Sequence, residues 1–390
     1  MHIAGGLYRE LCEVPFWDAT LGSGGRAARA IATLSPGSHL HTYAASEDKL
    51  ALEFLQQSGL KTSVCSRPSS IVFAYFHPLS HPYIQPDMLG VERLPPIEVD
   101  GDAVLRFGFL EGEAIVNANR AVYDPQTWRD PEPFLANGST ANELAIVLNE
   151  LELQSATGQK DIKQAAELLM KTQNAAVVVV KGGIRGATVF EKTGKMSQIP
   201  AYLSTQIFKI GTGDIFSAIF AFHWAERKLS AAEAAVWASQ SVSAYSETQK
   251  FSFQESSLSS RVPISSKSYG HILLEGCADS LGQRYVMEEA RFALSELGIK
   301  VNCPELNSGA EYTDIKSVLV IAHGLRNSII HRIKHTHDRG LPIVVLSELS
   351  DTPKILQNSY LDTTDFTTAL YHAAWAAGGD FRHGQNKTSL

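Results

Sequence analysis

The sequence predicts an α/β protein of two domains, each built on a parallel sheet that is covered by helices. Short β-rich runs alternate with segments of helical periodicity on both sides of residues 246–268. This alternation is typical of parallel sheets with helical crossovers. The run from Val177 to Val180 is β-branched throughout and lacks alternation, as expected of a strand buried on both faces.

The strand-like runs of the first domain are separated by helical segments. Ile162, Ala165 and Leu169 recur on one helical face between two of these runs. Ser230 and Glu233 have the spacing of a capping box, which predicts the start of another helix. The predicted strands cover residues 103–109, 120–125, 145–150 and 175–183.

The alternation resumes in the last third of the chain. Val286, Ala290 and Leu294 trace one face of a helix, and a further helix is predicted from about Ser328. The predicted strands cover residues 271–276, 317–324 and 342–348. We therefore expect a second doubly wound domain here.

The boundary between the domains is predicted from composition. Residues 246–268 are rich in serine and glutamine and show no sustained apolar period, which favours a linker. We assign one domain to residues 1–250 and another to 270–390, with 251–269 as the linker.

Composition limits the classes of function. Of 390 residues, 44% are hydrophobic and 19% charged, and the net charge is −7. These values are ordinary for a globular protein with real cores, and the acidic balance argues against nucleic acid as a partner. No apolar run approaches the ~20 residues that span a bilayer. Four scattered cysteines and an N-terminus unlike a signal peptide predict a cytoplasmic protein.

The most informative segment is IGTGDIFSA at Ile210–Ala218. Glycines before a helix let backbone amides converge on an anion, which the helix dipole also attracts. Such a nest can hold the charge of a transferring phosphoryl group, and Asp214 at its edge can take the proton of an acceptor hydroxyl. An N-capping aspartate after a tight glycine turn is the alternative interpretation.

Two further motifs suit the same chemistry. Asn149 and Glu152 follow a predicted strand, where such a pair can hold Mg²⁺ through waters near phosphates. A polar helix start is the alternative. The loop KGGIRG at Lys181–Gly186 follows the buried strand, and its glycines permit close approach of a nucleotide. A hairpin turn is the alternative there.

Together with GSGGRAARA at Gly22–Ala30, these motifs in this order resemble the ribokinase-like PfkB family of sugar and nucleoside kinases over residues 1–250. The resemblance implies a ribokinase-like doubly wound sheet with a small lid, and ATP-dependent phosphorylation of an alcohol group with Mg²⁺. It makes Asp214 the catalytic base. The other implied site residues are Gly211, Thr212 and Gly213 in the anion hole, Lys181, Gly183 and Gly186 at the nucleotide, Gly24 and Gly25 at the substrate, and Asn149 and Glu152 at the metal.

The sequence departs from the family pattern at several positions. Phe208 and Lys209 stand where the family has Asp-Thr, whose aspartate helps bind a monovalent cation. Lys209 would place a fixed positive charge near the nucleotide instead. Arg29 replaces an asparagine that touches sugar hydroxyls, and Glu10 replaces a substrate-clasping aspartate. We expect both residues to lie at the substrate. Because arginine pairs with carboxylate or phosphate, Arg29 predicts an acceptor with an anionic group, or at least one that is not a plain sugar. A salt bridge between Arg29 and Glu10 is the alternative.

The second domain resembles the nucleoside 2-deoxyribosyltransferase family, through Ser280–Arg291, Leu297–Val301 and Gly340–Val344. In that family a glutamate early in the helix before Gly-x-Pro attacks the anomeric carbon of the sugar. Arg332 falls at that position here, and a guanidinium that stays protonated cannot be that nucleophile. The resemblance therefore implies a flavodoxin-like or Rossmann-like domain that binds a nucleoside or nucleotide rather than one that transfers glycosyl groups.

Two alternatives for this domain stay open. Glu311 or Asp314 would replace the missing nucleophile if the loop were rearranged. His331 and His335 share a helix face and suggest a metal site, but Asp338 is the single carboxylate at a matching offset, so a solvated surface is favoured.

The sequence favours a PfkB-type kinase whose acceptor is a sugar-containing small molecule, and the second domain points to a nucleoside or ribosyl compound. Two other functions remain: a non-catalytic nucleotide-binding regulator, and a bifunctional enzyme of nucleoside salvage. The expected partners are small molecules rather than nucleic acid or membranes. PfkB relatives often pair through their lid strands, so a homodimer is compatible with the resemblance.

Overall fold

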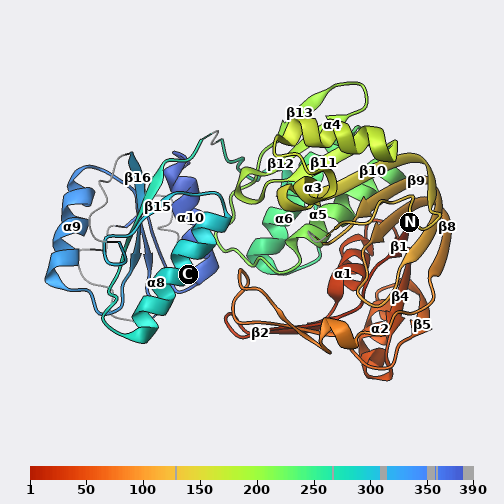
Figure 1. Cartoon of the computed structure of the whole chain (residues 1–390), viewed down its shortest axis with the longest axis horizontal. Helices are drawn as coiled ribbons and strands as arrows, with labels where there is room; N and C mark the ends of the chain where they lie inside the picture. The colour runs from red at the N-terminus through yellow and green to blue at the C-terminus, as the bar shows by residue number, and fades with distance from the viewer. Residues whose placement is uncertain (128–129, 266–267, 308–313, 349–355, 357–358, 381–390) are drawn as a thin grey trace. The chain divides into compact units, whose positions relative to one another are not determined.

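The chain forms two compact units (Figure 1). The first comprises residues 1–204 and 208–263, and the second comprises 205–207 and 264–390. The computed structural model describes residues 1–127, 130–265, 268–307, 314–348, 356 and 359–380.

Within these described ranges, a nine-stranded sheet forms the centre of the first unit. Neighbouring strands are parallel from β5 to β11, whereas β11, β12 and β13 pair antiparallel. In spatial order the strands are β13 (Met196–Ile199), β12 (Ala187–Glu191), β11 (Val177–Lys181), β10 (Thr140–Asn149), β9 (Ala114–Asp124), β8 (Ile97–Phe107), β1 (His2–Ala4), β4 (His39–Ala44) and β5 (Lys61–Ser66). The sheet is therefore mixed rather than wholly parallel, because a short turn at residues 182–186 reverses the chain after β11.

Helices flank this sheet, and the predicted capping box is present: Ser230 and Glu233 cap the helix that follows them reciprocally. The helices are α1 (Gly22–Ile31), α2 (Lys49–Gln57), α3 (Glu150–Thr157), α4 (Ile162–Gln173), α5 (Thr212–Ala221), α6 (Ala231–Thr248) and α7 (Glu255–Ser259).

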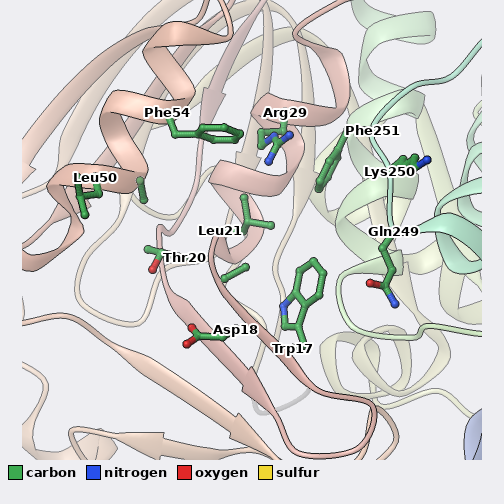
Figure 2. Close-up of a pocket in the computed structure, with 12 residues that line it drawn as sticks. Trp17, Asp18, Thr20, Leu21, Arg29, Leu50, Phe54, Gln249, Lys250 and Phe251 are labelled. Atoms are coloured by element: carbon green, nitrogen blue, oxygen red, sulfur yellow. The ribbon is translucent and has the colours of Figure 1, made fainter.

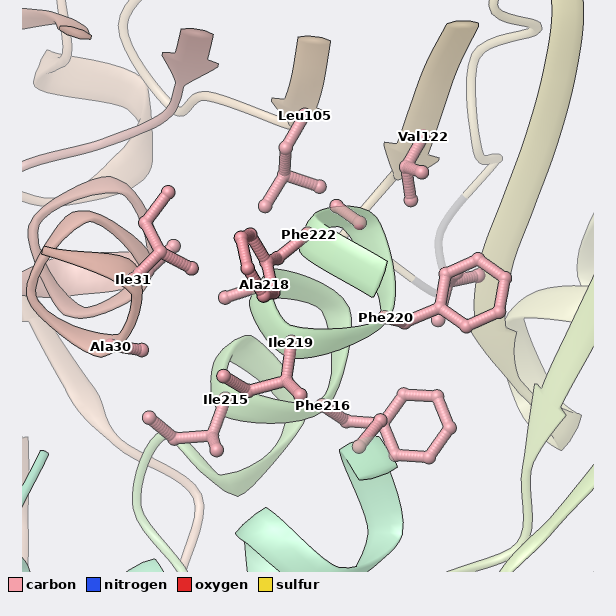
Figure 3. Packing of buried hydrophobic residues seen from close by; sticks show 14 of the residues in the cluster. Ala30, Ile31, Leu105, Val122, Ile215, Phe216, Ala218, Ile219, Phe220 and Phe222 are labelled. Carbon is pink, nitrogen blue, oxygen red and sulfur yellow. The ribbon is translucent and has the colours of Figure 1, made fainter. Parts of the chain in front are cut away.

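Helix α5 lies inside the main hydrophobic core (Figure 3). Ile215, Ile219 and Phe222 are buried in one cluster with Leu105 of β8 and Ile31 of α1. A helix that is apolar around its circumference must be covered on every side. The surrounding core therefore fixes the position of the first turn of α5, which contains Asp214.

The first unit also contains a smaller sheet, and a role for it as the lid stays a prediction. Its spatial order is β3-β2-β6-β7. Strand β2 pairs antiparallel with β3 and parallel with β6, and β6 pairs antiparallel with β7. The strands are β2 (Arg9–Cys12), β3 (Trp17–Thr20), β6 (Val72–Tyr75) and β7 (Tyr83–Gln85). Strand β2 of this sheet places Glu10 beside Arg26 of helix α1.

The second unit is built on a sheet in which all the described neighbours are parallel. Its spatial order is β15 (Val301–Asn302), β14 (His271–Glu275), β16 (Ile315–Ile321), β17 (Ile343–Leu346) and β18 (Leu361–Thr363). Its helices are α8 (Leu281–Glu296), α9 (Asn327–Asp338) and α10 (Phe366–Ala377). None of the helices in the described part of the chain is both long and apolar enough to cross a membrane.

The predicted linker differs from the structure over part of its length. Residues 251–263 belong to the first unit, and Phe253 and Leu258 are buried in its core. The serine-rich composition does not predict this packing. Two apolar side chains are enough to hold a short segment against a core, and two such residues produce no periodic pattern in the sequence.

Candidate active site

Three polar side chains meet at the carboxyl edge of the large sheet. Asp124 ends β9, Asn149 ends β10 and Lys181 ends β11, and Asn149 is the registered neighbour of Lys181. The carboxyl ends of parallel strands share one edge, where open α/β sheets bind their ligands. The sequence motifs at 149–152 and 181–186 are thus brought together here.

The first turn of α5 lies at the same edge. Gly211 is the N-cap residue, with a φ of 75°. A Cβ at this position would lie 2.0 Å from Nε of Arg26, so only glycine fits. The amide of Thr212 donates to the carbonyl of Lys209 (3.3 Å). Helix geometry offers no partner to the next two amides, those of Gly213 and Asp214. These two amides are available to an anion, and the roles of Gly211 and Thr212 in an anion hole stay predictions.

The carboxylate of Asp214 is buried and accepts two hydrogen bonds. Arg26 Nη1 donates to Oδ2 (2.8 Å), and Gln126 Nε2 donates to Oδ1 (2.6 Å). Asp214 as a whole is 8% exposed. Neither partner was predicted from the sequence as a site residue.

Arg26 is fully buried and joins two carboxylates. Its Nη1 donates to Glu10 Oε1 (2.9 Å), its Nη2 pairs with Glu10 Oε2, and its Nε donates to Tyr245 Oη (3.2 Å). Burial raises the pKa of Glu10, and the nearby guanidinium of Arg26 opposes that rise. The signal in the sequence was an arginine directly after Gly24 and Gly25, three residues before Arg29.

The two glycines themselves pack α1 against the loop after β1. A Cβ at Gly24 would lie 2.3 Å from the carbonyl oxygen of Gly5, and one at Gly25 would lie 2.9 Å from Leu7 Cδ1. These close contacts seat α1 and thereby set the position of Arg26.

Two lysines bring positive charge to the edge of the sheet. Lys181 Nζ donates to Asp124 Oδ2 (2.7 Å) and would lie 3.6 Å from a Cβ at Gly213. Lys209 Nζ donates to Thr212 Oγ1 (2.7 Å). Burial, and then the charge of Lys181, lowers the pKa of Lys209 to about 8. Both ammonium groups therefore lie beside the first turn of α5.

Asn149 and Glu152 cap helix α3 reciprocally. Asn149 Oδ1 accepts from the amide of Glu152 (2.9 Å), and Glu152 Oε2 accepts from the amide of Asn149 (2.7 Å). Burial raises the pKa of Glu152, with Lys181 opposing the rise. The polar helix start considered above is therefore present, and it leaves Glu152 Oε1 free of the cap.

Asp124 was not singled out as a site residue, although the sequence Asp-Pro after a strand is visible. Its Oδ2 accepts from Lys181 and also from Ser217 Oγ (2.6 Å). Its Oδ1 is buried and has no hydrogen-bond partner among the described residues. A buried carboxylate oxygen in this state suits a hard divalent cation such as Mg²⁺.

The loop at Lys181–Gly186 makes a hairpin turn between β11 and β12. The amide of Gly182 donates to the carbonyl of Gly186 (2.7 Å). Gly183 and Gly186 have φ values of 58° and 82°, and a Cβ at Gly186 would lie 2.1 Å from the carbonyl oxygen of Ile199. The glycines are thus explained by the turn itself, and a role at a nucleotide stays a prediction.

Arg29 does not pair with Glu10, which is occupied by Arg26. Its guanidinium lies between the rings of Phe54 and Phe251, 4.5 and 4.6 Å from their centroids (Figure 2). Burial lowers the pKa of Arg29. It lines a pocket of about 670 Å³ whose lining residues include neither Glu10 nor Asp214. The other lining residues are Trp17, Asp18, Ala19, Thr20, Leu21, Leu50, Ala51, Phe54, Gln249, Lys250 and Phe251.

In the second unit, Arg332 binds a buried carboxylate that ends β14. Its Nε and Nη2 donate to the two oxygens of Glu275 (2.8 and 2.7 Å), and Nη2 also donates to Glu305 (2.7 Å). Of the alternative nucleophiles, Asp314 pairs with Lys316 at the surface (2.9 Å), and Glu311 lies outside the described residues.

One segment of the chain is similar in sequence to a known protein family. Residues 118–253 match the family model described as pfkB family carbohydrate kinase. No curated protein matches the chain in sequence.

Several solved structures resemble the chain. A fructokinase from Vibrio cholerae, in its form bound to fructose, ADP and calcium, is 12% identical, with a TM-score of 0.48, over 66% of this chain and 97% of that one. A ribokinase from Thermotoga maritima is 14% identical, with a TM-score of 0.42, over 67% and 95%. A pyrophosphate-dependent kinase of the ribokinase family, complexed with a pyrophosphate analogue and myo-inositol, is 15% identical, with a TM-score of 0.45, over 66% and 99%.

The match over residues 118–253 includes Asp124, Asn149, Glu152, Lys181 and Asp214. The polar residues at the carboxyl edge of the large sheet therefore lie in the segment that is similar to the pfkB family carbohydrate kinases.

Proposed function

We propose that the first unit transfers the terminal phosphoryl group of ATP to a hydroxyl group of a sugar-containing small molecule. One observation carries this proposal. The two free amides at the start of α5, two lysines and the carboxylate of Asp214 lie around one helix turn. Phosphoryl transfer needs little covalent chemistry from the protein, so positioned charge of this kind is its main requirement.

The donor phosphates would lie against the amides of Gly213 and Asp214, near the ammonium groups of Lys181 and Lys209. Asp124 and Glu152, with Asn149 beside them, offer oxygen ligands for Mg²⁺ next to Lys181. When bound, Mg²⁺ neutralises charge on the phosphates. This arrangement supports the predicted roles of Lys209, Asn149 and Glu152, and adds Asp124 to them.

Asp214 would accept the proton of the acceptor hydroxyl at Oδ1. That oxygen is held by Gln126, whose backbone has a φ of 58°, and Oδ2 is held by Arg26. The acceptor hydroxyl must therefore replace the side-chain amide of Gln126 at Oδ1, while Arg26 keeps the carboxylate oriented. The charged carboxylate is the form that acts as a base, and Arg26 forms an ion pair with it at Oδ2.

The class of acceptor is proposed on two grounds. A nucleoside or ribosyl compound is favoured by the resemblance of the second domain, and the strand order of that unit, 2-1-3-4-5, is the order of flavodoxin-like folds. An anionic group on the acceptor is favoured by Arg29, which makes no ion pair among the described residues and lines an open pocket.

A nucleotide-binding regulator is the second candidate, and a specific observation favours it. Both oxygens of Asp214 are occupied, and Arg26 also fills the space beside the Gly211 turn. If these contacts persist with ligands bound, Asp214 cannot receive a proton. In that case both units would bind ligands without turnover.

The test measures ATP consumption against a panel of sugars, inositols and nucleosides, with wild-type protein and two matched variants. Asp214→Asn is expected to lower kcat/KM by about 10²–10⁴-fold, the usual size of general-base assistance. Asp161→Asn is the control, because Asp161 is also an aspartate at a helix N-terminus but is exposed, and asparagine caps equally well.

Each outcome separates the candidates. Turnover that survives in Asp214→Asn would remove the proposed base. Nucleotide binding by wild-type protein with no turnover for any acceptor would favour the regulator. Release of free base from nucleosides would favour the bifunctional enzyme instead.

A further inference from the structure

Three histidines gather on the large sheet, away from the edge that holds Asp214. His2 lies in β1, and His39 and His41 lie in the adjacent strand β4. His2 is the registered neighbour of His39, and residues two apart on a strand project from the same face. Strand β4 begins at His39, so the cluster lies towards the amino ends of these strands, opposite the edge where Asp124, Asn149 and Lys181 meet.

The ring nitrogens of this histidine cluster are close enough to share one ion. His2 Nδ1 lies 3.0 Å from His41 Nε2, and one ring nitrogen from each of the three lies within 4.8 Å of the others. Bonds of ~2.0–2.1 Å in a tetrahedral arrangement place ligand nitrogens roughly 3.3 Å apart. Small side-chain rotations therefore suffice to bring all three nitrogens to one metal ion.

The surroundings leave room for these rings and orient one of them. Gly101 of β8 lies against His2. A Cβ at position 101 would be 2.8 Å from the ring carbon Cδ2 of His2. His39 Nε2 lies 2.8 Å from Ser63 Oγ of β5. A hydrogen bond to one ring nitrogen fixes the ring so that the other can bind a metal.

The charge state of the histidine cluster also suits a metal. Burial is the first cause that lowers the pKa of each ring, and for His41 the value falls to about 4. Lys61 of β5 further lowers the pKa of His2 and His39, the N-terminal amino group further lowers that of His2, and the other two histidines further lower that of His41. Neutral imidazole is the form that binds metals.

We propose that His2, His39 and His41 form a site for one divalent transition-metal ion of the zinc class, with a fourth position open to water. Three nitrogen ligands select zinc, cobalt, nickel or copper over magnesium and calcium, which require oxygen ligands. Such an ion would join β1 to β4 and would be separate from the Mg²⁺ proposed near Asp124.

The experiment titrates the full chain, carrying no histidine tag, with Zn²⁺ by calorimetry and with Co²⁺ by visible absorption. Wild-type protein is expected to bind one ion per chain, and Co²⁺ is expected to show the intense visible bands of four-coordinate nitrogen ligation. His39→Gln and His41→Gln are each expected to weaken binding at least tenfold. His335→Gln on α9 is the matched control and should leave binding unchanged.

Either of two results would overturn the proposal: no saturable binding by wild-type protein, or equal weakening by His335→Gln. Circular dichroism checks that the variants are folded. If a variant fails to fold, chemical modification of wild-type histidines with diethylpyrocarbonate decides the matter. Zn²⁺ should then protect His2, His39 and His41 selectively, and equal modification with and without Zn²⁺ would refute the site.

Discussion

The two units contain similar clusters of charged side chains that differ in their exposure to solvent. Each places one arginine between two acidic side chains, and the two trios are Glu10–Arg26–Asp214 and Glu275–Arg332–Glu305. Arg26 is fully buried, whereas the side chain of Arg332 is 35% exposed. In the first unit, two lysines and a helix N-terminus lie close to the trio. The comparison teaches that an arginine between acids is by itself structural, and that the proposed phosphate site of the first unit depends on the neighbouring cations.

The largest expected difference between the trios is in stability. Arg26→Met removes the positive charge that pairs with two buried carboxylates and should lower the free energy of unfolding of the first unit by about 3–5 kcal/mol. Arg332→Met should cost the second unit about 1.5–3 kcal/mol, because water reaches that site. Hydrogen exchange by mass spectrometry in urea measures the two units separately.

Arg9→Met is the control for this pair of variants. Arg9 forms an exposed ion pair with Asp18, so the loss should stay below about 1 kcal/mol. Equal losses from Arg26→Met and Arg332→Met would show that burial does not distinguish the trios.

The next effect is a pH dependence that only the first unit should show. The pKa of Lys209 is lowered to about 8, mainly by burial, so its charge is lost as pH rises through that value. Affinity for inorganic phosphate or ADP should therefore fall between pH 7 and pH 9. In the second unit, the hydrogen bonds that Arg332 donates to Glu275 raise the pKa of Arg332, which keeps its charge throughout.

Calorimetry at several pH values measures this loss. Lys209→Arg keeps a positive charge at every pH tested and should flatten the profile. A profile of the same steepness in Lys209→Arg would assign the titration to another group.

The smallest expected effect concerns Arg29 and its pocket (Figure 2). Arg29→Asn should weaken binding of an anionic acceptor by about tenfold, the worth of one charged hydrogen bond at a partly open site. Binding of a neutral acceptor should not change. Arg227→Asn is a suitable control, because Arg227 lines a different pocket of the same unit. An unchanged preference between the two acceptors would assign Arg29 a packing role between its two aromatic neighbours.

Local features of the chain could be predicted because their causes are local. The strand at Val177–Val180, the capping box at Ser230 and the glycine turn before α5 each follow from a few adjacent residues, and all are present. The family match over residues 118–253 confirms the recognition of the PfkB pattern for that part of the chain. The fused nucleoside 2-deoxyribosyltransferase-like domain stays a prediction.

The sequence by itself therefore determined the alternation of strands and helices, and the motifs whose residues lie at the carboxyl edge of the large sheet. Only the tertiary structure decided which arginine meets Asp214, because Arg26 and Asp214 are 188 positions apart and both Arg26 and Arg29 follow the same glycine pair. The histidine cluster is also a tertiary feature, since the pairing of β1 with β4 brings His2 to His41 across 39 positions. Side chains distant in sequence are joined by the packing of whole elements, and no local pattern contains that information.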